Sequence, residues 1–462
     1  MAISMTTQWF IGHYISAEVF GQYGIFLSVV STLSMVFLSW PDGATFRIAR
    51  EEFIKWDRIG ETIYSRFALF LFCFLILIVC FPFFSLLPER FIEKFLFLKS
   101  ITGIILIGIF ITGLVQATIY INQSIGNLIP AGVNSLFINI VFFACLFIIH
   151  LSLKSYDYRY LGYSFVIANG IVLFFNLFNI PKKAFSHFQY NRQVLGKISF
   201  YSLMVPFGIF SVITIQWVDT WFIQYYMNST KVGIYYWAYQ MTVIGLVLFT
   251  PLVTILSPKI LEAYLKNDKK SVEEYIEQIP TALALLSLVG AIGYCFVWYV
   301  VQALSVGEFQ ESYNTIIILL AAIPFNLLAT LVTPVNAVKL EIISKTVYIS
   351  IATAAINILL DWLLIPIYGM EGAASATSFS FFFAALSQFI LMKYYFSEYN
   401  KNSPYEIILP LSSYLLVCIL FSVLDKNLAI LLTIGLIILL FFVYKKFNIL
   451  SIEKIKKFYN YL

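Results

Sequence analysis

Charged side chains are scarce in this sequence. Of its 462 residues, only 11% are Asp, Glu, Lys or Arg, whereas 61% are hydrophobic; a soluble domain has roughly 25% and 45–50%. The mean hydropathy is +0.88. These values exclude a soluble globular protein, and they predict a chain that lies mostly within a membrane.

Residues that usually carry catalysis or bind metals are few and scattered. The five cysteines lie in apolar runs and their number is odd, which disfavours a disulfide framework and a zinc site. The three histidines are isolated, and no H-E-x-x-H, C-x-x-C, phosphate-binding glycine loop or paired-acid motif occurs. We therefore expect no enzyme, no resident metal or cofactor and no nucleic-acid partner. The first basic residue is Arg47, so a secretory signal peptide is not expected either.

Fourteen apolar segments are bounded by charged residues, Pro or Gly. A membrane helix needs about 20 residues, so the predicted fold class is an all-α polytopic membrane protein with about 14 transmembrane helices. The first segment is the weakest because it is short. The segments are 3–16, 24–41, 67–88, 100–122, 127–151, 161–180, 198–224, 232–257, 280–303, 313–338, 346–366, 372–392, 407–424 and 428–444.

Basic residues are distributed unevenly over the connections between these segments. If the amino terminus is cytoplasmic, the inner connections and the tail hold 22 of the 29 Lys and Arg residues. By the positive-inside rule, this asymmetry predicts that both termini face the cytoplasm. No Lys or Arg is expected in the middle of a span. The inner connections 42–66 and 258–279 and the tail also have amphipathic patterns, which predict anchoring on anionic membrane lipid.

A weak internal repeat runs through the chain. Gly21 stands in the fragment VFGQYG between the first two spans, and Gly233 stands in VGIYY between the seventh and eighth, 212 residues later. Asn139 in the fifth span and Asn357 in the eleventh are 218 residues apart. The repeat predicts two pseudo-symmetric six-helix halves. Such halves usually enclose a site at the membrane midplane and alternate its access by rocking against each other.

The repeat also gives the predicted domain organisation. The amino-terminal half is 1–197, with spans 1 to 6, and the carboxyl-terminal half is 198–392, with spans 7 to 12. The remaining segment, 393–462, holds two additional spans and a basic cytoplasmic tail.

Asp219 and Asp361 are the two ionisable residues expected inside the spans. Gln216, Asp219 and Thr220 have the i, i+3, i+4 spacing of one helical face. Each acid fits either hydrogen bonding between membrane helices or the wall of a water-filled translocation cavity. The candidate cavity residues are Gln216, Asp219, Asn357 and Asp361, with coupling to protons or sodium left open. In the eleventh span the polar residues recur every three or four positions, at Thr346, Ser350, Thr353, Asn357 and Asp361.

Three fragments, in their order and spacing, resemble a known family. They are EVFGQYG after the first span, VDTWF in the seventh span followed by VGIYY, and INILLDWLLIP in the eleventh span running into YGMEGAASA. They resemble polysaccharide flippases of the O-antigen (Wzx) type, which belong to the multidrug/oligosaccharidyl-lipid/polysaccharide exporter superfamily. The resemblance covers nearly the whole chain.

The resemblance implies a multi-pass transporter of the bacterial inner membrane. It would move an undecaprenyl-diphosphate-linked oligosaccharide, an O-antigen or capsule repeat unit, from the cytoplasmic to the periplasmic leaflet, alongside a polysaccharide polymerase and a chain-length regulator. One alternative is a multidrug cation exporter of the same superfamily. Another is a membrane-bound glycan polymerase or transferase, which an outer loop bearing catalytic acids or arginines would have favoured; the outer connections are short.

A diphosphate headgroup must be gathered at the cytoplasmic surface, where basic side chains raise its local concentration and offer charge-assisted hydrogen bonds. Arg47 and Arg50 closely follow the second span, and Lys339 closely follows the tenth. These three are the candidate headgroup residues. The alternative is that they enforce topology or pair with Glu51 and Glu341.

Overall fold

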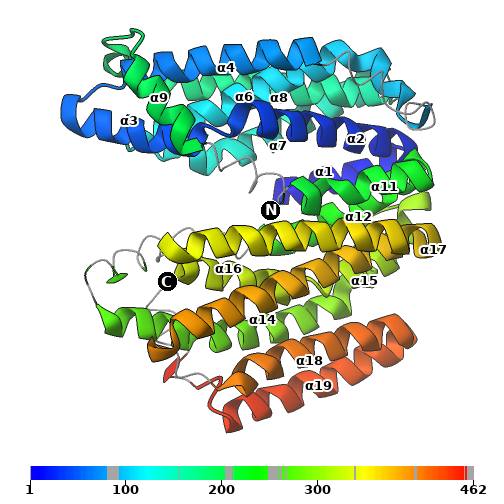
Figure 1. Ribbon diagram of the computed structural model, residues 1–462. Coiled ribbons are helices and arrows are strands. Elements are labelled where there is room, and N and C mark those ends of the chain that lie inside the picture. The colour runs from blue at the N-terminus through cyan, green and yellow to red at the C-terminus, as the bar shows by residue number, and fades with distance from the viewer. Residues whose placement is uncertain are drawn as a thin grey trace. The chain divides into compact units, whose positions relative to one another are not determined.

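The computed structural model describes residues 2–80, 93–153, 156–202, 211, 213–247, 260, 263–264, 266, 268–337, 340–399, 403–451 and 453–454. Within these ranges every regular element is a helix (Figure 1). The chain divides into two compact units, Ala2–Gly233 and Ile234–Leu462, and each is considered by itself. The division of the sequence into halves at 197/198 stays a prediction.

The first unit is a bundle built around α2, α6 and α8, which pack against one another. Phe26, Ile105 and Val172, one from each helix, are at most 1% exposed. α3 and α9 lie side by side, and α9 also packs on α4 (Figure 1). The elements are α1 (Ala2–Tyr14), α2 (Ala17–Leu33), π-helical η1 (Ser34–Ser39), α3 (Asp42–Trp56), α4 (Gly60–Cys80), η3 (Leu96–Ile101), α6 (Thr102–Ser124), α7 (Ile129–Leu153), α8 (Tyr158–Phe178), η4 (Lys182–Phe185), α9 (Arg192–Ser202), π-helical η5 (Thr214–Val218), α11 (Asp219–Tyr226) and α12 (Ser229–Val247), which continues past Gly233.

The two glycines of the sequence repeat lie against each other's helices. A Cβ atom at Gly21 in α2 would be 1.8 Å from the carbonyl oxygen of Ser229, and one at Gly233 in α12 would be 1.8 Å from that of Ala17. Ser229 lies four residues before Gly233, and Ala17 lies four residues before Gly21. The two contacts are therefore equivalent, as expected for helices related by a two-fold repeat. Because only hydrogen fits at either position, both repeat fragments carry glycine there.

The second unit contains the rest of α12 and the helices that follow it. Its elements are α14 (Lys269–Leu304), η6 (Gly307–Ser312), α15 (Tyr313–Leu320), α16 (Ile323–Ala337), α17 (Leu340–Tyr395), η7 (Ser397–Tyr399), α18 (Pro404–Val423) and α19 (Lys426–Lys446). α16 packs on α17, and α14 packs on both α18 and α19.

α17 consists of two helices joined by a sharp turn. Gly369 has φ 58° and ψ −133°, which is not helical and is favourable for glycine alone. A Cβ atom at Gly372 would lie 2.5 Å from the carbonyl oxygen of Leu364, although residues eight apart in a straight helix are about 12 Å apart. The chain therefore folds back here, between the predicted spans 346–366 and 372–392.

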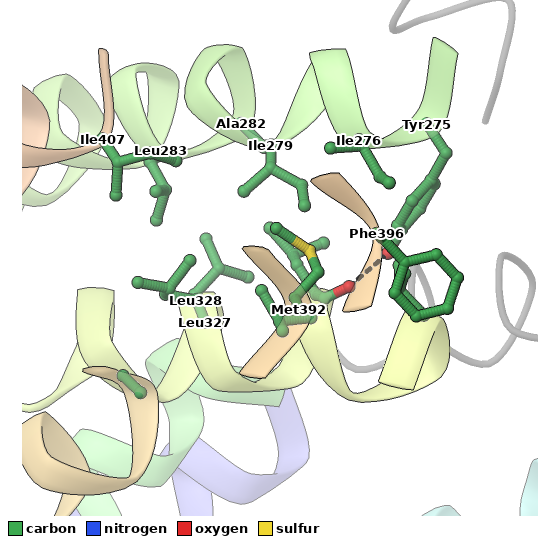
Figure 2. Packing of buried hydrophobic residues seen from close by; sticks show 14 of the residues in the cluster. Tyr275, Ile276, Ile279, Ala282, Leu283, Leu327, Leu328, Met392, Phe396 and Ile407 are labelled. Atoms are coloured by element: carbon green, nitrogen blue, oxygen red, sulfur yellow. Dashed lines mark hydrogen bonds between the residues drawn. The ribbon is translucent and has the colours of Figure 1, made fainter. Parts of the chain in front are cut away.

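A cluster of buried hydrophobic residues joins α14, α16, α17 and α18 in the second unit (Figure 2). Side chains from α14 point toward those of α16 and α17, and the hydroxyl of Tyr275 donates a hydrogen bond to the carbonyl oxygen of Leu331 at 2.7 Å. A buried tyrosine hydroxyl needs such a partner. The cluster includes Tyr275, Ile276, Ile279, Ala282, Leu283, Leu327, Leu328, Met392, Phe396 and Ile407.

Nine of the described helices are long and apolar enough to cross a membrane, and the bent pair Gly307–Leu320 and Ile323–Asn336 adds a tenth. Large apolar side chains such as Phe178 and Val423 are 82% and 74% exposed, as expected of residues that face lipid. The predicted all-α multi-pass membrane protein is thus confirmed. The count of about 14 spans stays a prediction, because 198–224 and 232–257 extend outside the described residues and α1 has only 13 residues.

Candidate functional site

A buried ion pair joins α4 to the start of α3 in the first unit. Nη2 of Arg66 donates to Oδ1 of Asp42 at 2.7 Å and to the carbonyl oxygen of Leu38 at 2.5 Å, and Nε donates to the same Oδ1 at 3.0 Å. The side chains of Arg66 and Asp42 are only 2% and 3% exposed. Burial raises the pKa of Asp42 to about 6, and the charge of Arg66 opposes this rise. At neutral pH the pair is therefore ionised although it is withdrawn from solvent.

The ion pair lies between two helix ends, the carboxyl end of η1 and the amino end of α3. Leu38 lies in the last turn of η1, a π-helical segment, and Asp42 is the first residue of α3. π-helical turns are frequent at functional sites, and the end of a helix leaves carbonyl groups without intrahelical donors. A helix carboxyl end favours a cation and an amino end favours an anion. Arg66 and Asp42 are thus each placed at the helix end that stabilises their charge.

An apolar cavity of about 530 Å³ lies beside this ion pair, between α4, α6, α8 and η4. This volume is within the range of roughly 300–1,000 Å³ that is usual for ligand pockets. Arg66 and Thr118 contribute to its wall, but the surface that the cavity presents is apolar. Nε and Nη2 of Arg66 donate to Asp42 and Leu38, and Nη1 is buried without a hydrogen-bond partner within the described ranges. The Thr118 hydroxyl donates to the carbonyl oxygen of Val115 at 2.9 Å.

Arg66 shows that the predicted start of the third span is too late. The sequence places Arg66 in the connection 42–66 and begins the span at residue 67. α4 begins at Gly60, so Arg66 lies in its second turn and is buried. The uninterrupted apolar run begins only at Phe67, so hydropathy places the helix start too late. Nothing in the sequence pairs Arg66 with Asp42, because they are 24 residues apart on different helices.

Buried amides join α6 to α8 in the same unit. Nδ2 of Asn122 donates to the carbonyl oxygens of Thr118 at 2.9 Å and Asn176 at 3.0 Å, and Nδ2 of Asn176 donates to Oγ1 of Thr118 at 3.3 Å. Hydrogen bonds of this kind between membrane helices contribute about 0.6–2 kcal/mol each. They fix α6 against α8, two of the helices that line the cavity.

The candidate headgroup residues Arg47 and Arg50 both lie on the exposed side of α3. The side chain of Arg47 is 74% exposed and pairs with Glu51 at 3.4 Å. Nη1 of Arg50 donates to the carbonyl oxygen of Ser124 at 3.0 Å, which is the last residue of α6. Arg50 therefore stabilises the end of a neighbouring helix, whereas Arg47 is accessible from solvent. The third candidate, Lys339, lies outside the described residues.

The polar stripe of α17 faces the protein interior. Thr353, Asn357 and Asp361 are at most 1% exposed, whereas Thr346 and Ser350 at the start of the stripe are half-buried. Neither polar atom of the Asn357 side chain has a hydrogen-bond partner within the described ranges. This helix face thus holds a carboxylate and an unsatisfied amide at a depth where unpaired polar groups are costly.

The stripe predicted around Asp219 does not form a single face. Asp219 and Thr220 are 3% and 2% exposed, but Gln216 is exposed. The reason is local: Thr214–Val218 is π-helical, so the 3.6-residue period that would place Gln216 and Asp219 on one face does not hold there. Gln216 and Asp219 belong to the first unit and Asn357 and Asp361 to the second. Among the described residues, no three His, Cys, Asp or Glu side chains cluster as metal ligands.

The fold is similar to that of known transporters. A lipid II flippase, MurJ, in an inward closed conformation aligns with a TM-score of 0.68 and 16% sequence identity, over 97% of this chain and 96% of that chain. An inward-facing multidrug resistance MATE family transporter of the MOP superfamily aligns with a TM-score of 0.58 and 14% identity, over 87% and 99%. A mutant of the Vibrio cholerae MATE transporter VcmN aligns with a TM-score of 0.52 and 12% identity, over 86% and 99%. No family model and no curated protein matches the sequence. The chain therefore has the fold that these transporters share.

Proposed function

We propose that this protein moves an undecaprenyl-diphosphate-linked oligosaccharide, an O-antigen or capsule repeat unit, from the cytoplasmic to the periplasmic leaflet of a bacterial inner membrane by alternating access. The observation that carries the proposal is the alignment of nearly the whole chain with a lipid II flippase. The resemblance of the three sequence fragments to O-antigen flippases points to the same class of substrate. The structural neighbours are transporters rather than enzymes, which supports a transport function.

The headgroup of this substrate would first meet the basic cytoplasmic surface. Arg47 is the best candidate contact, because its side chain is 74% exposed and its pairing with Glu51 is an exposed pair at 3.4 Å. Such pairs contribute little, about 0–1 kcal/mol, so a diphosphate can displace Glu51. Arg50 would contribute with its other donors, because its Nη1 is already bonded to the carbonyl oxygen of Ser124. Lys339 stays a candidate headgroup contact because of its position in the sequence. We also propose a polysaccharide polymerase, a chain-length regulator and anionic lipid as partners.

Coupling to a cation would use the buried acids. Asp361 is fully buried in α17, one turn after Asn357, and Asp219 is 3% exposed at the start of α11. Acidic side chains buried within membrane spans are rare, and they commonly mark ion pathways and proton relays. We propose that Asp361, with Asn357, takes part in binding the coupling proton or sodium ion, and that Asp219 serves the same purpose.

Depletion of the protein in its host tests the proposal. The lipid-linked glycan is expected to accumulate on the cytoplasmic leaflet, measured by its resistance to a glycan-modifying enzyme added to spheroplasts, and surface glycan is expected to fall. Re-expression of the wild type should restore both. An unchanged distribution of the glycan between leaflets would contradict the proposal.

A multidrug cation exporter is the second candidate, and the two MATE alignments favour it. It predicts that depletion raises sensitivity to cationic drugs and leaves surface glycan unchanged. The same depletion strain therefore separates the two functions, because each predicts a change where the other predicts none.

A further inference from the structure

The apolar cavity of the first unit is placed and lined as a site for a hydrocarbon chain. We propose that it binds part of the chain of a polyprenyl phosphate, and that the phosphate is held by basic side chains next to η4. The inference rests on the proposed function, which supplies a lipid of this class. It adds a lipid-binding site within the first unit, separate from the exposed arginines of α3 and from the buried stripe of α17.

The walls of the cavity suit a flexible apolar chain. Phe70, Ala117 and Leu173 contribute from α4, α6 and α8, and the surface that the wall residues present to the cavity is apolar. A cavity of about 530 Å³ with an apolar surface is not a site for a sugar or a hydrated ion. The hydrogen bonds of Arg66 and of Asn122 hold α4, α6 and α8 in place, so the cavity is preformed.

The edge of the cavity is formed by the segment around η4. Phe185 and Phe188 line the cavity and are 37% and 49% exposed, so the cavity opens beside them. This segment is fixed to the start of α4: the backbone N–H of Ile59 donates to the carbonyl oxygen of Ala184 at 3.0 Å. A Cβ atom at Gly60 would lie 2.2 Å from the carbonyl oxygen of Ser186. The opening therefore has a defined position.

Three basic residues lie in the two segments that meet at this opening. Lys182 is exposed in η4, three residues before Phe185, and has no ion-pair partner among the described residues. Lys183 is engaged with Asp57. Arg58 directly precedes the Ile59 that holds η4. Its Nε is buried and its guanidinium lies 5.8 Å from the centre of the Trp56 ring, which leaves its Nη groups for a phosphate. We therefore infer that Lys182 is the main phosphate contact beside the opening and that Arg58 is the second.

The combination of chain and phosphate is needed for specificity. Lipid tails in the bilayer are as apolar as the cavity, so a chain alone gains little by entering it. A phosphate at Lys182 and Arg58 supplies the additional free energy and selects a phosphorylated lipid over a neutral one. The connection 181–197 is predicted to be cytoplasmic, so the site would load from the leaflet in which the lipid-linked glycan is made.

Photo-crosslinking of the full chain tests this site. The protein, in nanodiscs of phosphatidylethanolamine and phosphatidylglycerol, is irradiated with a polyprenyl phosphate that carries a diazirine in its chain, and labelled peptides are mapped. We expect labels in α4, α6 or α8 around the cavity, and a fivefold or greater reduction by unlabelled undecaprenyl phosphate. Equal competition by added phosphatidylglycerol, or labels confined to other helices, would overturn the proposal.

Two variants with matched controls separate chain from headgroup. Ala117→Phe fills the cavity and should reduce labelling at least fivefold, whereas Ile107→Phe, on the 52% exposed face of the same helix, should not. Lys182→Ala should reduce labelling by the phosphate probe several-fold but leave labelling by the corresponding polyprenol unchanged; Lys270→Ala, exposed at the start of α14, is its control. Wild-type labelling of both Ala117→Phe and Lys182→Ala would overturn the proposal.

Binding and transport can fail separately in these experiments. If depletion leaves the leaflet distribution of glycan unchanged while the cavity is labelled, the proposed function fails and the lipid site stands. If glycan transport is confirmed while Ala117→Phe, eluting as a monodisperse protein, is labelled like the wild type, the lipid site fails and the transport function stands.

Discussion

Removing either partner of the buried ion pair should destabilise the protein, but the two losses should respond differently to pH. Arg66→Gln leaves the Asp42 carboxyl buried without its cation, and Asp42→Asn leaves the Arg66 guanidinium buried without its anion. Breaking a buried pair typically costs about 3–5 kcal/mol. A carboxyl can escape part of this cost by taking up a proton, whereas a guanidinium keeps its charge.

The magnitude follows from the proton affinity of Asp42. Its ordinary pKa is 3.8, and each pH unit corresponds to about 1.4 kcal/mol. Keeping this carboxyl protonated in the folded Arg66→Gln protein therefore costs about 5 kcal/mol at pH 7.5 and about 2 kcal/mol at pH 5.5. These values are upper limits to the cost of the substitution. Lowering the pH from 7.5 to 5.5 should thus raise the free energy of unfolding of Arg66→Gln by nearly 3 kcal/mol, that is, by about 2.7 kcal/mol.

The wild type and Asp42→Asn provide the comparison. In the wild type the folded pKa of Asp42, about 6, is above its unfolded value, so the folded state takes up the proton first and stability is lost as pH rises through that range. Acidification from pH 7.5 to 5.5 should raise the free energy of unfolding of the wild type by about 1 kcal/mol. Asp42→Asn has no such group, so the ion pair contributes no pH dependence to it.

Equilibrium unfolding of the purified variants in mixed micelles at the two pH values measures these differences. The double variant Asp42→Asn/Arg66→Gln removes both charges and should recover most of the stability lost in either single variant. The reasoning would be refuted if Arg66→Gln and Asp42→Asn lost the same free energy of unfolding and responded equally to pH. It requires that only the buried carboxyl can lose its charge, by taking up a proton.

The other predictions concern topology, coupling, headgroup binding and helix contact. A periplasmic phosphatase fused at Lys266 or at the carboxyl terminus should be inactive, because 22 of the 29 basic residues lie on the predicted inner side; activity there would reverse the topology. Asp361→Asn should lower surface glycan without lowering protein level, and full transport would leave this residue a packing role. Arg47→Ala should reduce glycan export with topology intact while Lys270→Ala should not; equal export by the two variants would contradict the headgroup role. Gly21→Ala should reduce the yield of folded protein severely, because its methyl group would overlap a carbonyl oxygen 1.8 Å away; a normal elution profile would show that α2 can shift.

The helical membrane fold could be predicted from the sequence because hydropathy is averaged over some twenty residues. The same averaging does not register single charged residues at the ends of a span, such as those of the buried ion pair. Arg66 stands directly before the apolar run that begins at Phe67, and Asp42 directly after the apolar segment 24–41, so hydropathy assigns both to a connection. Their pairing depends on the packing of α4 on α3, which no local pattern records. A charged residue next to a long apolar run is therefore worth testing as part of the helix.

Periodicity failed where the helix itself changes its geometry. Gln216 and Asp219 share a face only if the helix has 3.6 residues per turn, and η5 does not. In α17, between Thr353 and Asp361, the period holds and the predicted stripe is buried as one face. Gly21 and Gly233 are recognisable in the sequence for a different reason: the close approach of α2 and α12 excludes every side chain larger than hydrogen at both positions, and this leaves glycine in both fragments. The ion pair also depends on the approach of two helices, but many residue types tolerate its positions, so no sequence pattern marks it.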